Sequence, residues 1–363
     1  MISADDRTRA AALLQGFTDA GAIPVETEIL QPAGTLLDLY GEDIRGRAFT
    51  TYDPLTGETM LRPDFTVPVV QAHMANGADP ARYAYAGEVF RRQEVDEGRP
   101  REYLQVGYEV FDGTDPAGAD AEVFDLIARA LAPWNALPAT GDLGLLIAAI
   151  ESLTTSDRRR AALRRHLWRP VRFRRLMERF TGTVSPTQAR SALLSQLKTT
   201  APEVLIDAAG TAVGLRGADE IAERARALVE DAATPPIAPS EAEVISMLLE
   251  MDRPMAAALS PLRDMAADLP GLSDAVDRLE ARAEALAKRG HDPAHLSFAP
   301  ARGRSAMEYY DGFTFTFSAP AHPDLPPLAT GGRYDALTAV LGQGRSIPAV
   351  GGVIRPGLLG DLT

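Results

Sequence analysis

Two neighbouring segments between residues 90 and 109 carry side chains suited to binding an anion and an ammonium group. Arg91 ends the first segment, and its planar guanidinium can hold a carboxylate or a phosphate through two hydrogen bonds. Gln105, Gly107 and Glu109 occupy alternate positions of the second segment, which a β-strand would place on one face. Because Gly107 has no side chain, we expect a ligand to approach the backbone there, between the amide and the carboxylate.

A charged stretch at residues 94–100, containing Gly98 and Pro100, separates the two segments. Two strands joined in this way form a hairpin. A solvated hairpin with a polar face would show similar spacing, so the spacing alone does not distinguish a binding site from an ordinary surface.

Helices and strands expected around this hairpin would hold it in place. A stripe of apolar residues followed by Gly21 indicates an N-terminal helix, and Asp64 is placed to cap a later one. The apolar run at residues 143–150 fits either a strand or a helix. We expect helices over residues 5–20, 65–74 and 119–131 and strands over residues 23–30, 49–52 and 58–61.

The middle of the chain has a different composition. From about residue 151 to residue 290, Ala, Leu, Arg and Glu dominate between Pro and Gly breaks, which predicts helices and a last helix over residues 272–289. Nine arginines lie between Arg158 and Arg175. This basic stretch fits a solvated helix face or a subunit contact as well as it fits a nucleic acid site.

Strand patterns return near the C-terminus. We expect strands over residues 296–299, 307–317 and 349–354, and a turn at Gly331 and Gly332 that opens a helix over residues 335–341. Strands at both ends of a chain usually join one sheet. The prediction is therefore a sheet-bearing domain from residues 1–150 and 291–363, with a mainly helical insertion at residues 151–290.

Composition narrows the possible functions. The chain has 363 residues, 45% of them hydrophobic, which is enough for two or three domains. It has no cysteine, which excludes disulfides and thiolate metal ligands, and its five histidines are scattered, so we expect no metal. The net charge of −13 argues against a nucleic acid surface without forbidding a local basic patch.

Neither the hydrophobic pattern nor the N-terminal segment indicates a membrane protein. No run of about 18 apolar residues occurs, and the acidic, amphipathic N-terminal segment does not fit a signal peptide. We expect a cytoplasmic protein.

Four segments, in order, resemble the histidyl-tRNA synthetase family of class II aminoacyl-tRNA synthetases. MLRPDFTVPVV resembles that family's Leu-Arg-Pro-Glu-Gly-Thr segment, and FRRQ with the following QVGYE resembles its motif 2. MEYYDGFTFTF and ATGGRYDAL resemble its Tyr-Tyr and Gly-Gly-Arg-Tyr segments. The resemblance covers about residues 1–150 and 290–359. It implies an α+β fold, an antiparallel sheet flanked by helices, that dimerises through residues 22–30.

The resemblance also implies a pocket for free histidine. Carboxylates and an amide suit an ammonium group, an arginine suits a carboxylate, and tyrosine hydroxyls suit the imidazole nitrogens. Asp64 is one methylene shorter than the Glu usual in the family. The implied histidine-binding residues are Asp64, Thr66, Arg91, Gln105, Glu109, Tyr310 and Tyr334.

The family's catalytic residues are not matched in the same way. Gln93 replaces the motif 2 glutamate, with Glu94 beside it on the opposite side of a regular strand. Ser305 aligns with the catalytic arginine, and the adjacent Arg304 would point to the other face. We expect no catalytic residue and no aminoacylation.

The last motif departs further from the family. GGVIRPGLL replaces a segment that normally ends in Gly-Leu-Glu-Arg, and Pro356 cannot donate a backbone hydrogen bond. Arg355 would compensate only if the backbone took another path. The chain ends at Thr363, so we expect no anticodon-binding domain.

A synthetase-like core without synthetase chemistry resembles the regulatory subunits of ATP phosphoribosyltransferase. That resemblance implies a non-catalytic subunit of the first step of L-histidine biosynthesis, without a cofactor or tRNA. Its partner would be the short-form catalytic subunit, in a hetero-octamer, with L-histidine as feedback ligand. The alternatives are a divergent or minimal histidyl-tRNA synthetase, and an amino-acid-binding module or scaffold for another enzyme.

Overall fold

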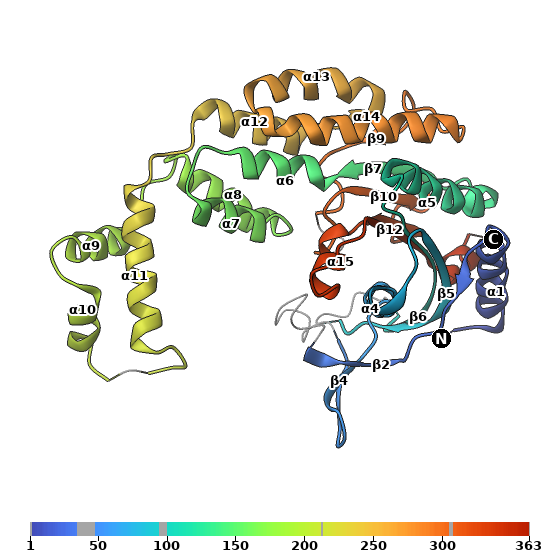
Figure 1. Cartoon of the computed structure of the whole chain (residues 1–363), viewed down its shortest axis with the longest axis horizontal. Coiled ribbons are helices and arrows are strands. Elements are labelled where there is room, and N and C mark those ends of the chain that lie inside the picture. Colours follow the sequence, from blue (N-terminus) through green and yellow to red (C-terminus); the bar gives the residue numbers. More distant parts are fainter. Residues whose placement is uncertain (1, 35–47, 94–99, 212, 305–307, 363) are drawn as a thin grey trace.

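A nine-stranded, mostly antiparallel sheet forms the centre of the protein in a computed structural model (Figure 1). The structure describes residues 2–34, 48–93, 100–211, 213–304 and 308–362. The order of the strands is β1-β5-β6-β12-β11-β10-β7-β9-β8, so strands from both ends of the chain share the sheet, as expected. They are β1 Ile23–Pro24, β5 Ala81–Phe90, β6 Glu102–Phe111, β7 Leu137–Asp142, β8 Arg253–Pro254, β9 Ser297–Phe298, β10 Phe313–Ser318, β11 Ala329–Arg333 and β12 Ala349–Ile354.

A second, three-stranded sheet consists of β2 (Leu30–Pro32), β4 (Gly57–Leu61) and β3 (Thr50–Asp53), in that order. The single strand expected over residues 23–30 is wrong. β1 ends at Pro24, the N–H of Val25 makes one more bond to the carbonyl of Ala84 in β5 at 2.9 Å, and the chain then crosses to the small sheet.

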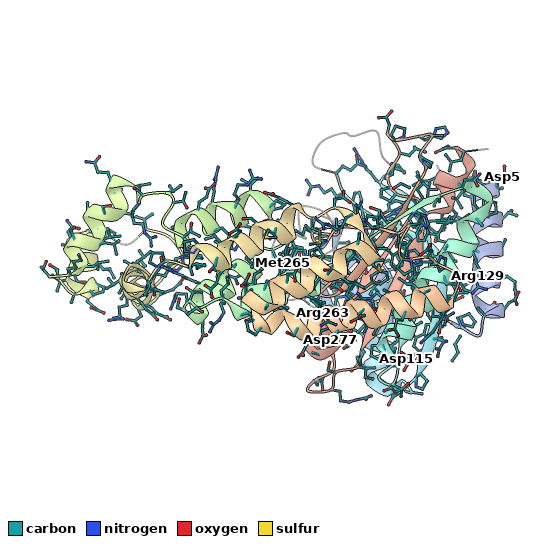
Figure 2. The ribbon with its side chains drawn as sticks, turned by 90° about the horizontal axis from the view of Figure 1, so that it is seen from above. Asp5, Asp115, Arg129, Arg263, Met265 and Asp277 are labelled. Carbon is teal, nitrogen blue, oxygen red and sulfur yellow. The ribbon has the colours of Figure 1, made fainter. Side chains whose placement is uncertain are left out.

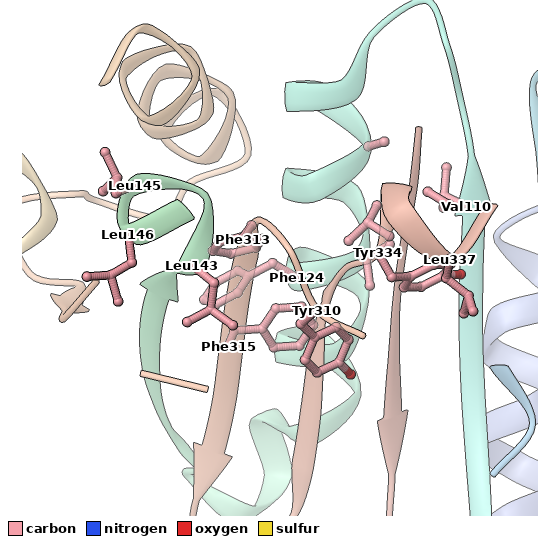
Figure 3. Packing of buried hydrophobic residues seen from close by; sticks show 14 of the residues in the cluster. Val110, Phe124, Leu143, Leu145, Leu146, Tyr310, Phe313, Phe315, Tyr334 and Leu337 are labelled. Atoms are coloured by element: carbon pink, nitrogen blue, oxygen red, sulfur yellow. The ribbon is translucent and has the colours of Figure 1, made fainter. Parts of the chain in front are cut away.

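One face of the large sheet is apolar and packs against two helices. The rings of Phe124, from α5 (Pro116–Leu131), and Phe315 lie 5.6 Å apart (Figure 3). Phe17, from α1 (Ala4–Asp19), packs on Tyr108 at 5.4 Å. Burying large aromatic side chains in this way removes much apolar area from water, which fixes the position of the hairpin strands β5 and β6.

Glycines and polar residues line the opposite face, which α4 (Thr66–Asn76) and α15 (Asp335–Leu341) approach.

The turn expected at Gly331 and Gly332 is wrong, because both lie within β11. A Cβ on Gly331 would come within 2.1 Å of the Phe315 ring, so this strand needs glycine to admit an aromatic side chain rather than to turn.

The middle of the chain is helical, as expected, and the open choice at residues 143–150 is a helix, α6. Asp142 caps it by accepting the N–H of Gly144 at 2.8 Å. The helices are α6 Leu143–Ser152, α7 Asp157–Arg165, α8 Pro170–Phe180, α9 Gln188–Leu197, α10 Pro202–Ala208, α11 Ala218–Ala233, α12 Pro239–Glu250, α13 Met255–Asp268 and α14 Ser273–Lys288.

Two groups stand out among these helices. Helices α9, α10 and α11 extend away from the sheet (Figure 1). Helices α13 and α14 lie side by side, joined by an ion pair between Arg263 and Asp277 (Figure 2). Because α14 packs on α5 and α6 touches β10, the domain boundaries near residues 150 and 291 stay a prediction. Within the described ranges, no helix has the length and apolar character needed to span a membrane.

Candidate functional site

The carboxylate of Glu109 lies at the centre of a buried polar cluster on the glycine-rich face. Its side chain is 1% exposed. One oxygen accepts the hydroxyls of Thr66 and Tyr85, both at 2.9 Å, and the other accepts the hydroxyl of Tyr334 at 2.6 Å. Burial raises the pKa of Glu109 to about 7, although the three hydroxyl donors favour the charged form. This site therefore holds a carboxyl group that titrates near neutral pH.

Two glycines make room for this cluster. A Cβ on Gly351 would lie 1.4 Å from Oε2 of Glu109, so the carboxylate rests directly on the backbone of β12. A Cβ on Gly107 would lie 2.1 Å from the ring of Tyr85. The expectation that a ligand reaches the backbone at Gly107 is therefore wrong. Tyr85, paired with Gly107 across the β5–β6 ladder, fills that space and stacks on Phe65 at 4.4 Å.

The acidic end of the site also contains Asp64 and Gln105. Asp64 is 4% exposed and accepts the N–H of Val67 at 3.4 Å, so it helps to cap α4, although Phe65 is the cap residue. Gln105 is 1% exposed, and its side-chain oxygen has no hydrogen-bond partner among the described residues. A buried polar atom without a partner is costly, so this amide is a natural point for a ligand to bind.

Two arginines mark the opposite, cationic end. Arg91, just beyond β5, donates to the carbonyl of Pro63 at 3.1 Å. Arg355 follows β12 and donates to the carbonyl of Pro327 at 2.7 Å and to Thr330 at 3.2 Å. Within the described part of the chain, no carboxylate forms an ion pair with Arg355. Burial lowers its pKa, and the charge of Arg91 lowers it further.

Arg355 is the residue whose role the sequence understated, because it was expected to contribute only through a change of backbone path. The backbone takes no such detour. The N–H of Arg355 bonds to the carbonyl of Leu328 at 2.9 Å, which continues the β12 ladder. Pro356 then begins α16 (Pro356–Gly360), and the residue before a proline favours an extended conformation. That preference was the available sequence signal for the position of Arg355. If the strand continues through Arg355, alternation places its side chain on the same face as Gly351.

Tyr310 lies between the two ends. It is 6% exposed, and burial raises its pKa. The charges of Glu109 and Asp64 raise it further, whereas Arg355 opposes them. Its ring lies on Gly332, where a Cβ would be 2.8 Å away; Figure 3 shows it near Tyr334.

All of the histidine-binding residues inferred from the sequence thus lie on this face or at its edge, and Tyr85 and Arg355 join them. Among the described residues, no cluster of His, Asp and Glu is suited to holding a metal ion.

The residues compared with synthetase catalytic groups do not form a second cluster. Arg304 donates to the carbonyl of Leu167 at 2.7 Å and packs over Phe173 of α8, so its contacts are with the helical insertion. Gln93 lies just beyond β5 and is partly buried. Ser305 and Glu94 lie outside the described residues.

The chain is similar to known proteins of one family. Residues 3–234 and 216–356 match the family model "Histidyl-tRNA synthetase". The ATP phosphoribosyltransferase regulatory subunit of Brucella anthropi is 32% identical over 344 residues, covering 90% of this chain and 89% of that protein. The subunit of the same name from Agrobacterium fabrum is 33% identical over 358 residues, covering 94% and 93%.

A solved structure also matches. It is described as an ATP phosphoribosyltransferase regulatory subunit/histidyl-tRNA synthetase from Bacillus halodurans, with a TM-score of 0.66. The match covers 99% of this chain and 79% of that one at 21% identity, so it supports the fold alone.

Proposed function

This chain belongs to the family of ATP phosphoribosyltransferase regulatory subunits, which have the histidyl-tRNA synthetase-like fold, and from that premise we propose that it is a histidine sensor. A regulatory subunit of this enzyme is not itself the catalyst, and it implies a catalytic partner. In the proposal, free L-histidine binds in the cluster around Glu109, and its binding reports the level of the pathway's end product to that partner.

The observation that carries the proposal is the separation of charge across the site. Glu109 and Asp64 form an acidic end, Arg91 and Arg355 form a cationic end, and Tyr310 is affected by both. A free amino acid is a zwitterion whose ammonium and carboxylate groups complement these two ends. The hydroxyls of Tyr85 and Tyr334 donate to Glu109, and their oxygen lone pairs can still accept an N–H from an imidazole.

The proposed role of each side chain follows from this polarity. Glu109, Asp64 and Gln105 receive the ammonium group, and Arg91 and Arg355 receive the carboxylate. Thr66 and Tyr334 hold Glu109 in place by hydrogen bonds, and Tyr310 covers the ligand.

Feedback inhibition requires a further condition. Histidine must bind the inhibited assembly more tightly than the active one, because a ligand with equal affinity for both states shifts neither. We place this equilibrium in a cytoplasmic hetero-octamer with the short-form catalytic subunit, in which this chain dimerises through residues 22–30, without tRNA or a cofactor. The sheet-bearing part, residues 1–150 and 291–363, would carry the pocket.

The test is a phosphoribosyltransferase assay of the catalytic subunit, alone and with this protein, titrated with L-histidine. We expect activity to require this chain, and histidine to inhibit the complex. The Glu109→Gln variant should still activate but should require at least about tenfold more histidine for inhibition. Unchanged inhibition of that variant would place histidine sensing elsewhere.

A parallel measurement addresses the synthetase alternative. Histidine-dependent exchange between ATP and pyrophosphate by the isolated chain would contradict the non-catalytic role. We expect none above the buffer control, because Arg304, the nearest candidate for the catalytic arginine, contacts α8.

A further inference from the structure

A hollow of about 520 Å³ lies in the helical insertion, among α7, α8, α9 and α11, well away from Glu109 along the chain. Figure 1 shows α7 and α8 on the side of the insertion toward the sheet, and α9 and α11 in the part that extends away from it. Its lining includes five arginines and one carboxylate, contributed by all four helices. They are Arg158, Arg159, Arg179, Arg190, Arg224 and Asp231.

The cations around the hollow exceed the anions that can pair with them. Asp231 accepts Arg159 at 2.7 Å and Arg190 at 2.8 Å, one on each oxygen. At the rim, Arg158 lies 4.0 Å from the carboxylate of Glu230, and Arg224 pairs with Glu220 at 3.2 Å. In a chain of net charge −13, this local excess of positive charge runs against the overall balance.

The guanidinium of Arg179 has N–H donors that no hydrogen bond within the described part of the chain uses. Its nearest carboxylate oxygen, on Asp231, is 4.0 Å away, which is too far for a hydrogen bond. Its guanidinium lies 4.6 Å from the ring of Phe180, and its side chain is 42% exposed. Burial lowers the pKa of Arg179, and Arg190 and Arg159 lower it further against the opposing effect of Asp231. An added anion would therefore stabilise the charged form of Arg179.

Hydrogen bonds hold two other arginines of the hollow, Arg159 and Arg190, in place. Arg159 is 7% exposed and donates to three backbone carbonyls, those of Asp231, Thr234 and Pro235, in addition to its ion pair. Those bonds tie α7 to the end of α11. The hydrogen bond from Arg190 to Asp231 ties α9 to the same helix.

We propose that this hollow binds a small phosphorylated anion. Phosphate oxygens are well matched to several guanidinium groups at once. The volume lies in the range of about 300–1,000 Å³ that is usual for small-molecule sites. A half-open hollow whose lining also includes the apolar side chains of Phe180 and Leu228 suits a compact ligand, whereas a nucleic acid backbone follows an extended basic stripe.

The test is calorimetric titration of the full-length chain with inorganic pyrophosphate at constant ionic strength, without histidine or the catalytic partner. Arg179→Ala is the informative variant, because the Arg179 side chain makes no hydrogen bond within the described part of the chain whose loss would unfold the site. Arg172→Ala is the matched control, an exposed arginine on the same helix that does not line the hollow.

We expect the unmodified chain and the Arg172→Ala variant to bind pyrophosphate equally, and the Arg179→Ala variant to bind at least about tenfold more weakly. Three results would each overturn the proposal: no binding by the unmodified chain, equal binding by the Arg179→Ala variant, or equal weakening in both variants. The last would reveal general attraction to the basic helix face. Because histidine is omitted, none of these outcomes depends on the function of the Glu109 cluster.

Discussion

Glu109 is a carboxyl group held out of water by the sheet and surrounded by hydroxyl donors. Its three hydrogen-bond partners are neutral hydroxyls, and none of the described residues forms an ion pair with it. A group in this state is poised to accept a ligand's ammonium group, which would supply the missing countercharge.

The first prediction concerns stability and pH. The pKa of Glu109 is about 7 in the folded state against an ordinary value of 4.5, so the folded protein binds this proton more tightly than the unfolded chain. The resulting stabilisation is fully present below about pH 4.5 and is lost as the pH rises through about 7. We expect the unfolding free energy of the unmodified chain, relative to Glu109→Gln, to fall by on the order of 1–3 kcal/mol across that range. Urea unfolding at several pH values measures it, and a flat difference would contradict the raised pKa.

The second prediction separates the two ends of the proposed ligand. Arg355→Gln removes the positive charge proposed to bind the carboxylate and leaves Glu109 to bind the ammonium group. It should therefore weaken L-histidine binding by about tenfold. It should leave the binding of histamine, which has no carboxylate, unchanged. Calorimetry with both ligands measures this, with Arg172→Gln as an exposed control. Equal loss of both ligands would mean that Arg355 supports the site structurally rather than binding the carboxylate.

At the scale of elements, the backbone of β12 and the buried ion pairs of α5 set the geometry of the site. Asp120 of α5 is 1% exposed and bonds to Arg282 of α14 at 2.6 Å and to Arg333 of β11 at 2.8 Å. Arg333 immediately precedes Tyr334, which holds Glu109. The helical insertion and the site are therefore connected through α5 by a continuous chain of bonds.

The third prediction tests that connection. Asp120→Asn leaves two buried guanidinium groups with less compensation, and we expect it to destabilise the chain by about 3–5 kcal/mol. Urea unfolding provides the measurement. Arg263→Ala, which removes two exposed ion pairs between α13 and α14, with Asp277 and Glu280, is the control and should have little or no measurable effect. Equal, small effects would show that the buried network contributes little.

The fourth prediction concerns the glycine beneath the carboxylate. In Gly351→Ala, the new Cβ would overlap Oε2 of Glu109, so the carboxylate must move and lose its bond from Tyr334. We expect destabilisation of about 1–3 kcal/mol together with weaker histidine binding. Gly357→Ala, in α16 with no atom within 4 Å of its Cβ, should change neither. Thermal unfolding and calorimetry on both variants make the comparison.

At the scale of the whole molecule, the sheet joins the two ends of the chain, while the insertion carries the separate arginine-lined hollow. The segment expected at a dimer contact exposes apolar side chains: Ile23 is 59% exposed, and Ile29 and Leu30 are each 43% exposed. Exposed apolar residues gathered in one segment are typical of an interface.

The fifth prediction follows from that exposure. Light scattering should show the unmodified chain as a dimer, and Ile29→Asp should shift it toward a monomer, because a buried, unpaired carboxylate opposes association. Val171→Asp, at a 64% exposed position on α8, is the control and should stay dimeric. A dimer that resists Ile29→Asp would place the interface on another surface.

Local sequence signals determined many of the helices and strands of this protein. Alternation in β6, the helix patterns of α1, α5 and α15, and the apolar run of β12 depend on neighbouring residues alone. Strand period and residue type also place Gln105 and Glu109 on one face, whereas their choice as binding residues came from the family resemblance and stays a prediction. The family was also visible in the order of its motifs.

Tertiary structure alone decided which side chains meet. Glu109 receives hydroxyls from residues 24 and 225 positions away, and only the register of the assembled sheet brings them together. That register seats Tyr85 on Gly107, where an open approach was expected, and turns Arg355 toward the site. It also converts Gly331 and Gly332 from a supposed turn into a strand. Periodicity determines the face of a strand to which a residue belongs, but the occupant of the space above that face is set by packing between strands distant in the chain.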